Sequence, residues 1–240
     1  MPLTLYPAVD IQDGRAVRLV QGMADSTTVY DEDPVAAARR WAAQGAQWLH
    51  VVDLDAAFHG TPRNRRLIAD IVVATGVPVQ ASGGIRTLAD LDASIGYGAS
   101  RVVIGTMALE DPHLVAQAVA RHGDKVAVGL DADGTTLRAR GWTAESGDLF
   151  EALKRLTEMG VARFVFTDIA RDGMLGGPNL DRLRQVAEAT TAQVTASGGV
   201  SSLDDLLALG AAHERVDAAI VGKALYAGRF TLAEALEVCG

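Results

Sequence analysis

Short runs of apolar and β-branched residues alternate with longer amphipathic runs along the whole sequence. Each short run has the length of a buried strand, and each longer run has the spacing of a helix with one apolar face. Near-continuous apolar strands that alternate with helices are typical of a parallel sheet covered by helices. The alternation gives eight strand–helix units, the number that closes into a barrel. We therefore predict an α/β fold, the (β/α)8 or TIM barrel.

The expected elements leave no break at which a second domain would begin. With 240 residues, of which 49% are hydrophobic, the chain is long enough to bury one large core. We therefore predict a single barrel domain over residues 1–240. The expected strands are 3–10, 48–53, 79–82, 101–104, 126–131, 163–168, 193–197 and 218–222. The expected helices are 34–44, 64–75, 88–95, 112–122, 148–159, 180–190, 202–209 and 231–238.

Several motifs recur at a spacing of 115 residues. The tetrapeptide Ala-Ser-Gly-Gly at 81–84 returns at 196–199, and the valines that lead to Asp53 have a counterpart in the residues that lead to Asp168. We predict that the barrel consists of two duplicated half-barrels, roughly 1–122 and 123–240. A site on one half would then have a counterpart across the barrel mouth. The alternative is that the two halves acquired the same small motifs by convergence.

The two Gly-Gly turns each follow an expected strand and precede an expected helix. This order places them at the C-terminal face of the barrel, where backbone N–H groups and helix N-termini can meet an anion. We predict two phosphate cradles, although Gly-Gly can also simply make a tight turn. The residues expected to bind substrate are Ser82, Gly83, Gly84, Arg86, Gly105 and Thr106 in the first half, and Ser197, Gly198, Gly199, Gly222 and Lys223 in the second.

Carboxylates stand at the ends of several expected strands. An acid that ends a barrel strand points into the mouth, where a charge is costly unless it is used. We expect Asp10 to be a general base and Asp172 a general acid, a pair that moves protons without a metal. For Asp13, Asp53 and Asp133 we expect ordinary solvated loop acids.

Two segments are long enough to close over a ligand, and we expect both to be loops. The first, 11–33, carries Arg18, and the second, 132–147, carries Arg140 and Trp142. An arginine fork and an indole can grip a planar anion and exclude water. The alternative for both arginines is a place on the solvated surface.

Composition and motif spacing argue against several other classes of protein. A net charge of −8 with mixed signs disfavours nucleic acid as a partner, and no apolar run is long enough to span a membrane. The single cysteine, Cys239, suits a reducing compartment, so we expect a cytoplasmic protein.

The lysines and histidines limit the chemistry in the same way. Lys125 and Lys154 lie at the wrong strand end and on a helix, so a Schiff-base lysine in the barrel is not expected. The five histidines lack zinc-site spacing, and we expect His50 to pack under a helix. There is no Gly-rich dinucleotide fingerprint, so we expect neither a metal nor a cofactor.

The chain resembles the ribosyl-phosphate isomerases of histidine biosynthesis, and within them the actinobacterial phosphoribosyl isomerase A branch. The resemblance covers essentially the whole chain and is carried by AVDIQDGRAVRLVQG, HVVDLDAAF, ASGGIR, VGLDADG, RGW, FTDIARDGMLGGPNL and ASGGVSSLDDL. It implies an Amadori rearrangement of ProFAR, which has a phosphate at each end, to PRFAR. Asp10 matches the general base, Asp172 the general acid, and Asp131 and Thr167 assisting polar residues.

Members of this branch also isomerise phosphoribosyl anthranilate to CdRP in tryptophan biosynthesis, which implies a second activity here. Arg18, Arg140 and Trp142 match the residues that bind this substrate from the lids. We also expect Gly173 and Gly177, in the matching segment after the sixth strand, to contact the substrate. Met174 departs from the family, which often has Thr after Asp-Gly at this point.

Three alternatives remain open at this stage. The protein could be a ProFAR isomerase alone. It could be the cyclase subunit of imidazole glycerol phosphate synthase, although that family typically has a lysine where this chain has Arg18. It could also be a phosphometabolite-binding barrel without catalysis. For all three, small phosphoribosyl molecules are the expected partners, and we expect a monomer.

Overall fold

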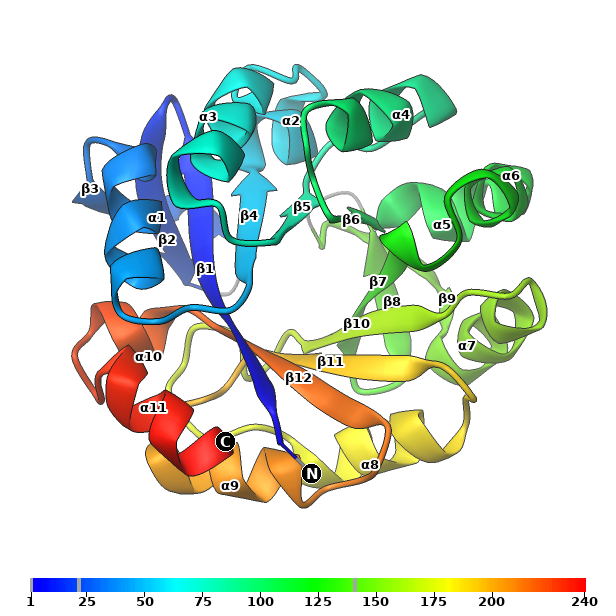
Figure 1. Ribbon diagram of the computed structural model, residues 1–240. Helices are drawn as coiled ribbons and strands as arrows, with labels where there is room; N and C mark the ends of the chain where they lie inside the picture. The colour runs from blue at the N-terminus through cyan, green and yellow to red at the C-terminus, as the bar shows by residue number, and fades with distance from the viewer. Residues whose placement is uncertain (1, 21–22, 140–141) are drawn as a thin grey trace.

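Eight parallel strands close into a barrel in the computed structural model, which describes residues 2–20, 23–139 and 142–240 (Figure 1). The strands in order around the barrel are β1 (Thr4–Gln12), β4 (Leu49–Asp53), β5 (Val79–Ser82), β6 (Arg101–Ile104), β7 (Val126–Asp133), β10 (Arg163–Asp168), β11 (Gln193–Ser197) and β12 (Val216–Val221). The pairing of β7 with β10 and of β12 with β1 completes the ring. The TIM barrel predicted from the sequence is confirmed, and all eight expected strands agree with these bounds to within two residues.

Helices surround the barrel, as Figure 1 shows. Those that were expected are α1 (Pro34–Ala43), α3 (Arg65–Thr75), α4 (Leu88–Gly96), α6 (Pro112–His122), α7 (Leu149–Glu158), α8 (Leu180–Glu188), α9 (Leu203–Gly210) and α11 (Leu232–Cys239). The sequence determines their first residues through caps, because a side-chain oxygen there accepts an otherwise unpaired helical N–H. Thr87 with Asp90 and Ser202 with Asp205 form two such capping boxes, again 115 residues apart.

The two segments expected to be loops are antiparallel ribbons instead. β2 (Arg15–Val20) and β3 (Met23–Asp31) extend β1, whereas β8 (Thr136–Ala139) and β9 (Ala144–Asp148) extend β7. Each ribbon begins at an Asp-Gly pair, and Gly14 and Gly134 have φ values of 74° and 62°. This backbone conformation makes the tight turn of a hairpin, so the expectation of loops was wrong.

Short helices follow three barrel strands at the same end of the barrel. They are α2 (Leu54–His59), α5 (Thr106–Glu110) and α10 (Lys223–Tyr226), and none of them was expected from the sequence. α5 and α10 begin immediately after Gly105 and Gly222, and neither start has a side-chain cap. Backbone N–H groups at these two starts therefore lie at the barrel mouth.

The interior of the barrel is filled by its own small cluster of side chains. Buried residues from five strands form it: Tyr6, Ala8, Val103, Ala127, Val165, Ala218 and Ile220. At the N-terminal end, the guanidinium of Arg101 donates to the Tyr6 hydroxyl at 2.9 Å and lies 4.6 Å from the ring centroid of Trp48. The side chains thus fill the bottom of the barrel and leave space at the opposite end.

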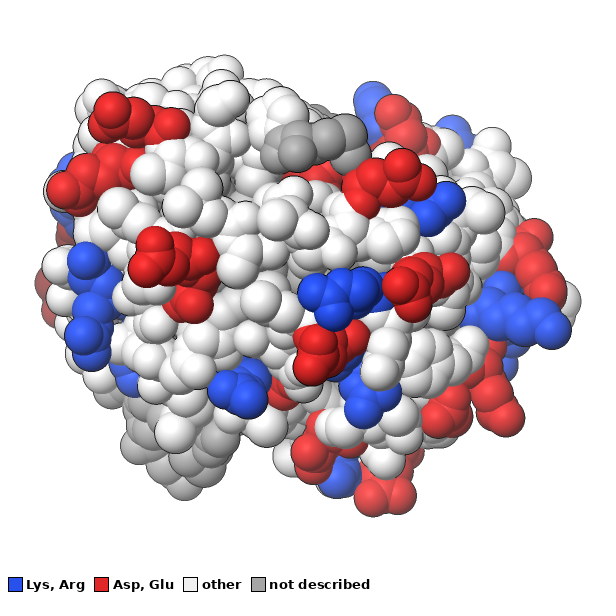
Figure 2. Space-filling model, turned by 90° about the horizontal axis from the view of Figure 1, so that it is seen from below, with Lys and Arg blue, Asp and Glu red and all other residues white. Residues whose placement is uncertain are grey.

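The surface mixes charges of both signs. In the view of Figure 2, acidic and basic side chains lie next to one another in small groups, and uncharged surface separates the groups. Of the helices in the described part of the chain, none combines the length and the apolar character needed to cross a membrane.

Candidate active site

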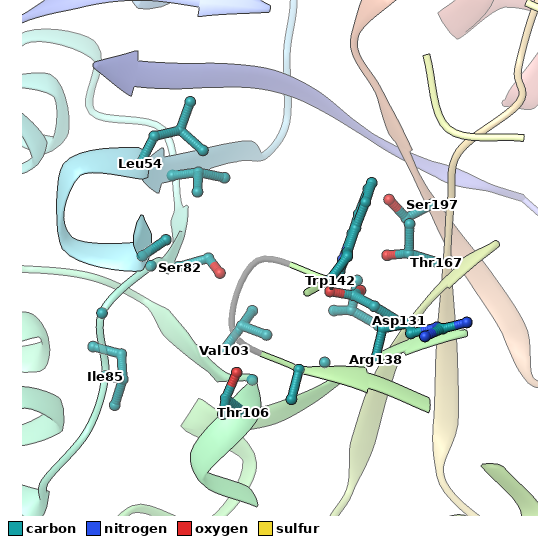
Figure 3. Close-up of a pocket in the computed structure, with 18 of the residues that line it drawn as sticks. Leu54, Ser82, Ile85, Val103, Thr106, Asp131, Arg138, Trp142, Thr167 and Ser197 are labelled. Atoms are coloured by element: carbon teal, nitrogen blue, oxygen red, sulfur yellow. Dashed lines mark hydrogen bonds between the residues drawn. The ribbon is translucent and has the colours of Figure 1, made fainter. Parts of the chain in front are cut away.

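A cavity of about 600 Å³ lies at the C-terminal ends of the barrel strands. Both halves of the chain line it, and Figure 3 shows Trp142 beside Asp131, Thr167 and Ser197, with Ser82 and Thr106 on the other side. The expected site residues that line it are Asp10, Ser82, Gly83, Gly84, Arg86, Gly105, Thr106, Asp131, Trp142, Thr167, Asp172 and Ser197. The fold therefore gathers residues that are up to 187 positions apart, from Asp10 to Ser197.

A smaller cavity of about 30 Å³ adjoins the first at the second Gly-Gly turn. Asp172 and Ser197 border both cavities. The other expected residues that line the smaller one are Gly173, Gly198, Gly199, Gly222 and Lys223. The ammonium of Lys223 donates to the carbonyl oxygen of Gly173 at 2.8 Å, which places a cation at this cavity.

Of the expected binding residues, one lies outside both cavities, and two fall wholly or partly outside the described structure. Gly177 lines neither cavity, and its N–H donates to the carbonyl oxygen of Gly199 at 3.0 Å, so it supports the second turn. Arg18 belongs to β2, but its side chain is outside the described part of the structure, and Arg140 lies outside the described residues altogether.

The Gly-Gly turns need glycine for reasons of space as well as conformation. Gly83 and Gly198 have φ values of 96° and 92°, in the left-handed region that side chains disfavour. A Cβ at Gly83 would lie 2.2 Å from the carbonyl oxygen of Asp53, and one at Gly199 would lie 2.5 Å from that of Gly177. Each turn therefore packs directly against the backbone of the preceding βα segment and presents its own backbone to the cavity.

Asp131 is the centre of a partly buried polar cluster. It pairs in register with Thr167 on the neighbouring strand, and its Oδ2 accepts the indole N–H of Trp142 at 2.7 Å. Burial raises the pKa of Asp131 above the ordinary 3.8, and hydrogen bonds from Trp142 and Thr167 oppose this shift. The charge of Asp172 raises that pKa as well. The two carboxylates disfavour each other's charge, so together they retain a proton more readily than separate acids would.

Asp10 lies on β1 at the point where the barrel and the first ribbon meet. Its register partners are Val52 on β4 and Val17 on β2, so backbone on both sides fixes its place. The carboxylate lines the same cavity as Asp172. In the order of strands around the barrel, β1 and β10 are separated by β11 and β12.

The expectation for Asp53 was wrong, whereas those for Asp13 and Asp133 are confirmed. The side chains of Asp13 and Asp133 are more than half exposed, at 59% and 57%. Asp53 is only 1% exposed, and its carboxylate accepts the N–H of Ala56 at 3.0 Å and the side-chain amide of Asn64 at 2.8 Å. An acid that ends a strand is thus used here to hold the following segment.

The expectation that His50 packs under a helix was also wrong. It points into the barrel and lines the large cavity, where its Nδ1 lies 3.1 Å from Nε2 of Gln80. Gln80 Oε1 accepts from Arg101 at 3.4 Å, which turns the amide nitrogen of Gln80 toward His50. In this arrangement His50 Nδ1 accepts the amide N–H of Gln80. The alternation of side chains along 48–53 was the signal, since Trp48 and His50 fall on one face.

We expect Asp131→Asn to make the protein more stable than the wild type near neutral pH. Because burial raises the pKa of Asp131, the unfolded chain loses this proton before the folded protein does as pH rises. The free energy of unfolding of the wild type therefore falls as pH rises above the ordinary pKa of 3.8, and this loss persists at neutral pH. Denaturant unfolding at about pH 7 and about pH 4 measures the difference, which shrinks at the lower pH.

The exposed Asp133 provides the control for this substitution. Asp133→Asn is expected to change the free energy of unfolding by less than about 0.5 kcal/mol, because it is a surface change. An Asp131→Asn variant that is less stable than the wild type near neutral pH would contradict the account of the buried carboxylate.

Comparison with known proteins identifies the family of this chain. A family model described as histidine biosynthesis protein matches residues 4–231. The chain belongs to this family. All the motifs from which the resemblance was inferred lie within the matched residues, so the resemblance is confirmed.

Relatives within the family match along the full length. One from Frankia casuarinae, named 1-(5-phosphoribosyl)-5-((5-phosphoribosylamino)methylideneamino) imidazole-4-carboxamide isomerase, is 59% identical over 240 residues, covering 100% of this chain and 94% of its own. A protein from Streptomyces griseus named phosphoribosyl isomerase A is 58% identical over 236 residues, or 98% of this chain and 97% of its own. A relative from Bifidobacterium longum subsp. infantis with the same name as the Frankia protein is 56% identical over 241 residues, or 99% of each chain.

Proposed function

We propose that the protein is an isomerase that converts ProFAR to PRFAR, the Amadori rearrangement of histidine biosynthesis. The observation that carries this proposal is the placement of Asp10 and Asp172 on one cavity that lies between two Gly-Gly turns. The names of the full-length relatives support the same reaction. We further propose a cytoplasmic, monomeric enzyme that needs no cofactor.

The two turns explain why the substrate would carry two phosphates. In each half, a Gly-Gly turn stands beside the uncapped start of a short helix, at Gly105 and at Gly222. Backbone N–H groups at such places attract anions. Arg86 adds positive charge at the first turn and Lys223 at the second.

The carboxylates between the turns would move the protons. Asp172 protonates the ring oxygen of the ribose and opens the furanose to a Schiff base. Asp10 then removes the proton from C2, and the resulting enolamine becomes the ketone. The proximity of Asp131 helps to keep a proton within the pair that it forms with Asp172, which an acid catalyst requires.

We also propose that the enzyme isomerises phosphoribosyl anthranilate to CdRP. This substrate has one phosphate and a ring that carries a carboxylate. The support is Trp142, which adopts a φ of 69° and brings its indole to Asp131 at the cavity. This conformation is uncommon for a residue with a side chain, and here it directs the indole into the cavity.

Steady-state turnover of the purified protein on the two substrates separately, with a chelator present, tests both proposals. Turnover of both supports two activities without added metal. Turnover of ProFAR alone would overturn the second activity. Turnover of neither would overturn the isomerase, and conversion of PRFAR with ammonia would then identify the cyclase.

We expect Arg140→Ala to lower kcat/KM for phosphoribosyl anthranilate at least ten times more than for ProFAR. The reason is chemical, because only the anthranilate substrate brings a ring carboxylate for a guanidinium to bind. Parallel kinetics on the two substrates measure the difference, and Arg39→Ala, an exposed arginine that lines neither cavity, is the control. Equal losses of kcat/KM on both substrates would show that Arg140 serves to close its segment over either ligand and does not recognise the ring carboxylate.

A further inference from the structure

The segment that carries Asp172 is tied together at its two ends. It runs from the end of β10 to the start of α8, and Asp168 and Asn179 are the residues at those two points. The side-chain amide of Asn179 donates to Oδ2 of Asp168 at 2.8 Å. On its other side, Oδ1 of Asn179 accepts the N–H of Arg182 at 3.1 Å and caps the helix. One side chain thus joins the strand, the segment and the helix.

Asp168 also holds Asp172 directly through the backbone. Its carbonyl oxygen accepts the N–H of Arg171 at 3.1 Å and that of Asp172 at 3.0 Å. The side chain of Asp168 is only 8% exposed, and its Oδ1 is buried without a hydrogen-bond partner among the described residues. The amide of Asn179 is therefore the partner on which this buried carboxylate depends, and its loss would leave the strand end free to shift.

The first half of the chain has a similar amide–carboxylate bond without the acid, although the Asn64 side chain does not cap the helix that follows and its amide also donates to Asp55 at 2.7 Å. The amide of Asn64 donates to Asp53 at 2.8 Å, and each of these residues lies 115 positions before its counterpart. Here the carboxylate has additional donors, the N–H groups of Ala56 and Asn64. The segment 54–63 carries neither the proposed acid nor the proposed base, so the chain contains its own control.

We propose that Asn179, through Asp168, is a positioning residue for the general acid Asp172. The amide–carboxylate bond fixes the start of α8 relative to the end of β10, and this sets where the carboxyl of Asp172 lies. Proton transfer depends steeply on such placement, because a shift of about 1 Å can cost about 100-fold in rate. The inference rests on the proposed function of Asp172.

Serine substitutions separate positioning from helix capping. Serine is as good an N-cap as asparagine but has no amide donor that reaches the carboxylate. We expect Asn179→Ser to lower kcat for ProFAR by about tenfold or more while KM changes by less than about twofold. The matched Asn64→Ser variant is expected to keep kcat within about twofold. Asp168→Asn retains an oxygen that can accept from Asn179, and it should keep at least about five times the kcat of Asn179→Ser.

Hydrogen exchange of the backbone amides gives a readout that does not need turnover. The amides of Arg171 and Asp172 should exchange faster in Asn179→Ser than in the wild type or in Asn64→Ser. Unchanged kcat and exchange in Asn179→Ser, or an equal loss of kcat in both serine variants, would overturn the positioning role. A wild type that does not convert ProFAR would instead overturn the proposed function. The exchange data would still show whether Asn179 positions the segment, because they do not depend on turnover.

Discussion

Asp10→Asn is expected to lower kcat for ProFAR by about 10²- to 10⁴-fold, which is the range for removal of a general base. An amide in place of the carboxylate cannot take the C2 proton, whereas the register of β1 with its neighbours Val17 and Val52 does not depend on the charge. Binding is therefore expected to survive. Kinetics on both proposed substrates, together with the affinity for the product PRFAR, measure the two effects separately.

Asp13→Asn is the control for this experiment, because Asp13 lies three residues away on the same ribbon and is exposed. It should retain nearly full activity. An Asp10→Asn variant that turns over at more than about a tenth of the wild-type rate would show that another group removes the proton.

Gly83→Ala is expected to reduce the free energy of unfolding by more than about 3 kcal/mol. Two effects add at this position. The φ of 96° is disfavoured for alanine, and the new Cβ would lie 2.2 Å from the backbone oxygen of Asp53. Backbone at a strand end cannot move aside as a flexible side chain can, so the turn itself must shift. Denaturant unfolding, with kcat/KM measured on any folded fraction, reports both the stability and the first phosphate cradle.

Gly76→Ala separates the two effects. Gly76 ends α3 with a φ of 63°, but a Cβ there would meet nothing within 4 Å. Its expected cost is about 1 kcal/mol, the ordinary penalty of the left-handed conformation. Similar costs at both positions would mean that the close approach to Asp53 is relieved by a small movement.

The sequence is sufficient to predict the barrel because local signals and global closure agree. Apolar β-branched runs bounded by caps and glycines define each unit, and the number of units decides the architecture. The ribbons were harder to predict, because their strands pair only with each other and with the extended ends of β1 and β7. Such pairing gives a weak hydrophobic pattern, although the Asp-Gly pairs at 13–14 and 133–134 are a hairpin signal.

A site residue could be predicted from the sequence where its position at the end of a barrel strand is enough to place it in the site. Residues at the C-terminal ends of strands face the mouth in any such barrel, which is why Asp10 and Asp131 could be chosen. Side-chain partners could not be chosen in this way. The contact of Trp142 with Asp131 depends on the path of a ribbon, and the burial of Asp53 depends on Asn64, eleven residues later. The error over His50 is of another kind, because the alternation along 48–53 places His50 on the same face as Trp48 and was readable from the sequence.

The ribbons begin where the proposed chemistry ends. β1 passes through Asp10 before it continues into the first ribbon, and β7 passes through Asp131 before it continues into the second. The two kinds of pairing overlap here, because Asp10 pairs with Val52 in the barrel and with Val17 in its ribbon, and Ala132, next to Asp131, pairs with Asp168 in the barrel and with Leu137 in its ribbon. Each ribbon therefore joins its barrel strand next to a carboxylate, Asp10 in the first case and Asp131 in the second. A substitution within a ribbon can therefore change the lining of the mouth while the barrel pairing that places Asp10 and Asp131 stays the same.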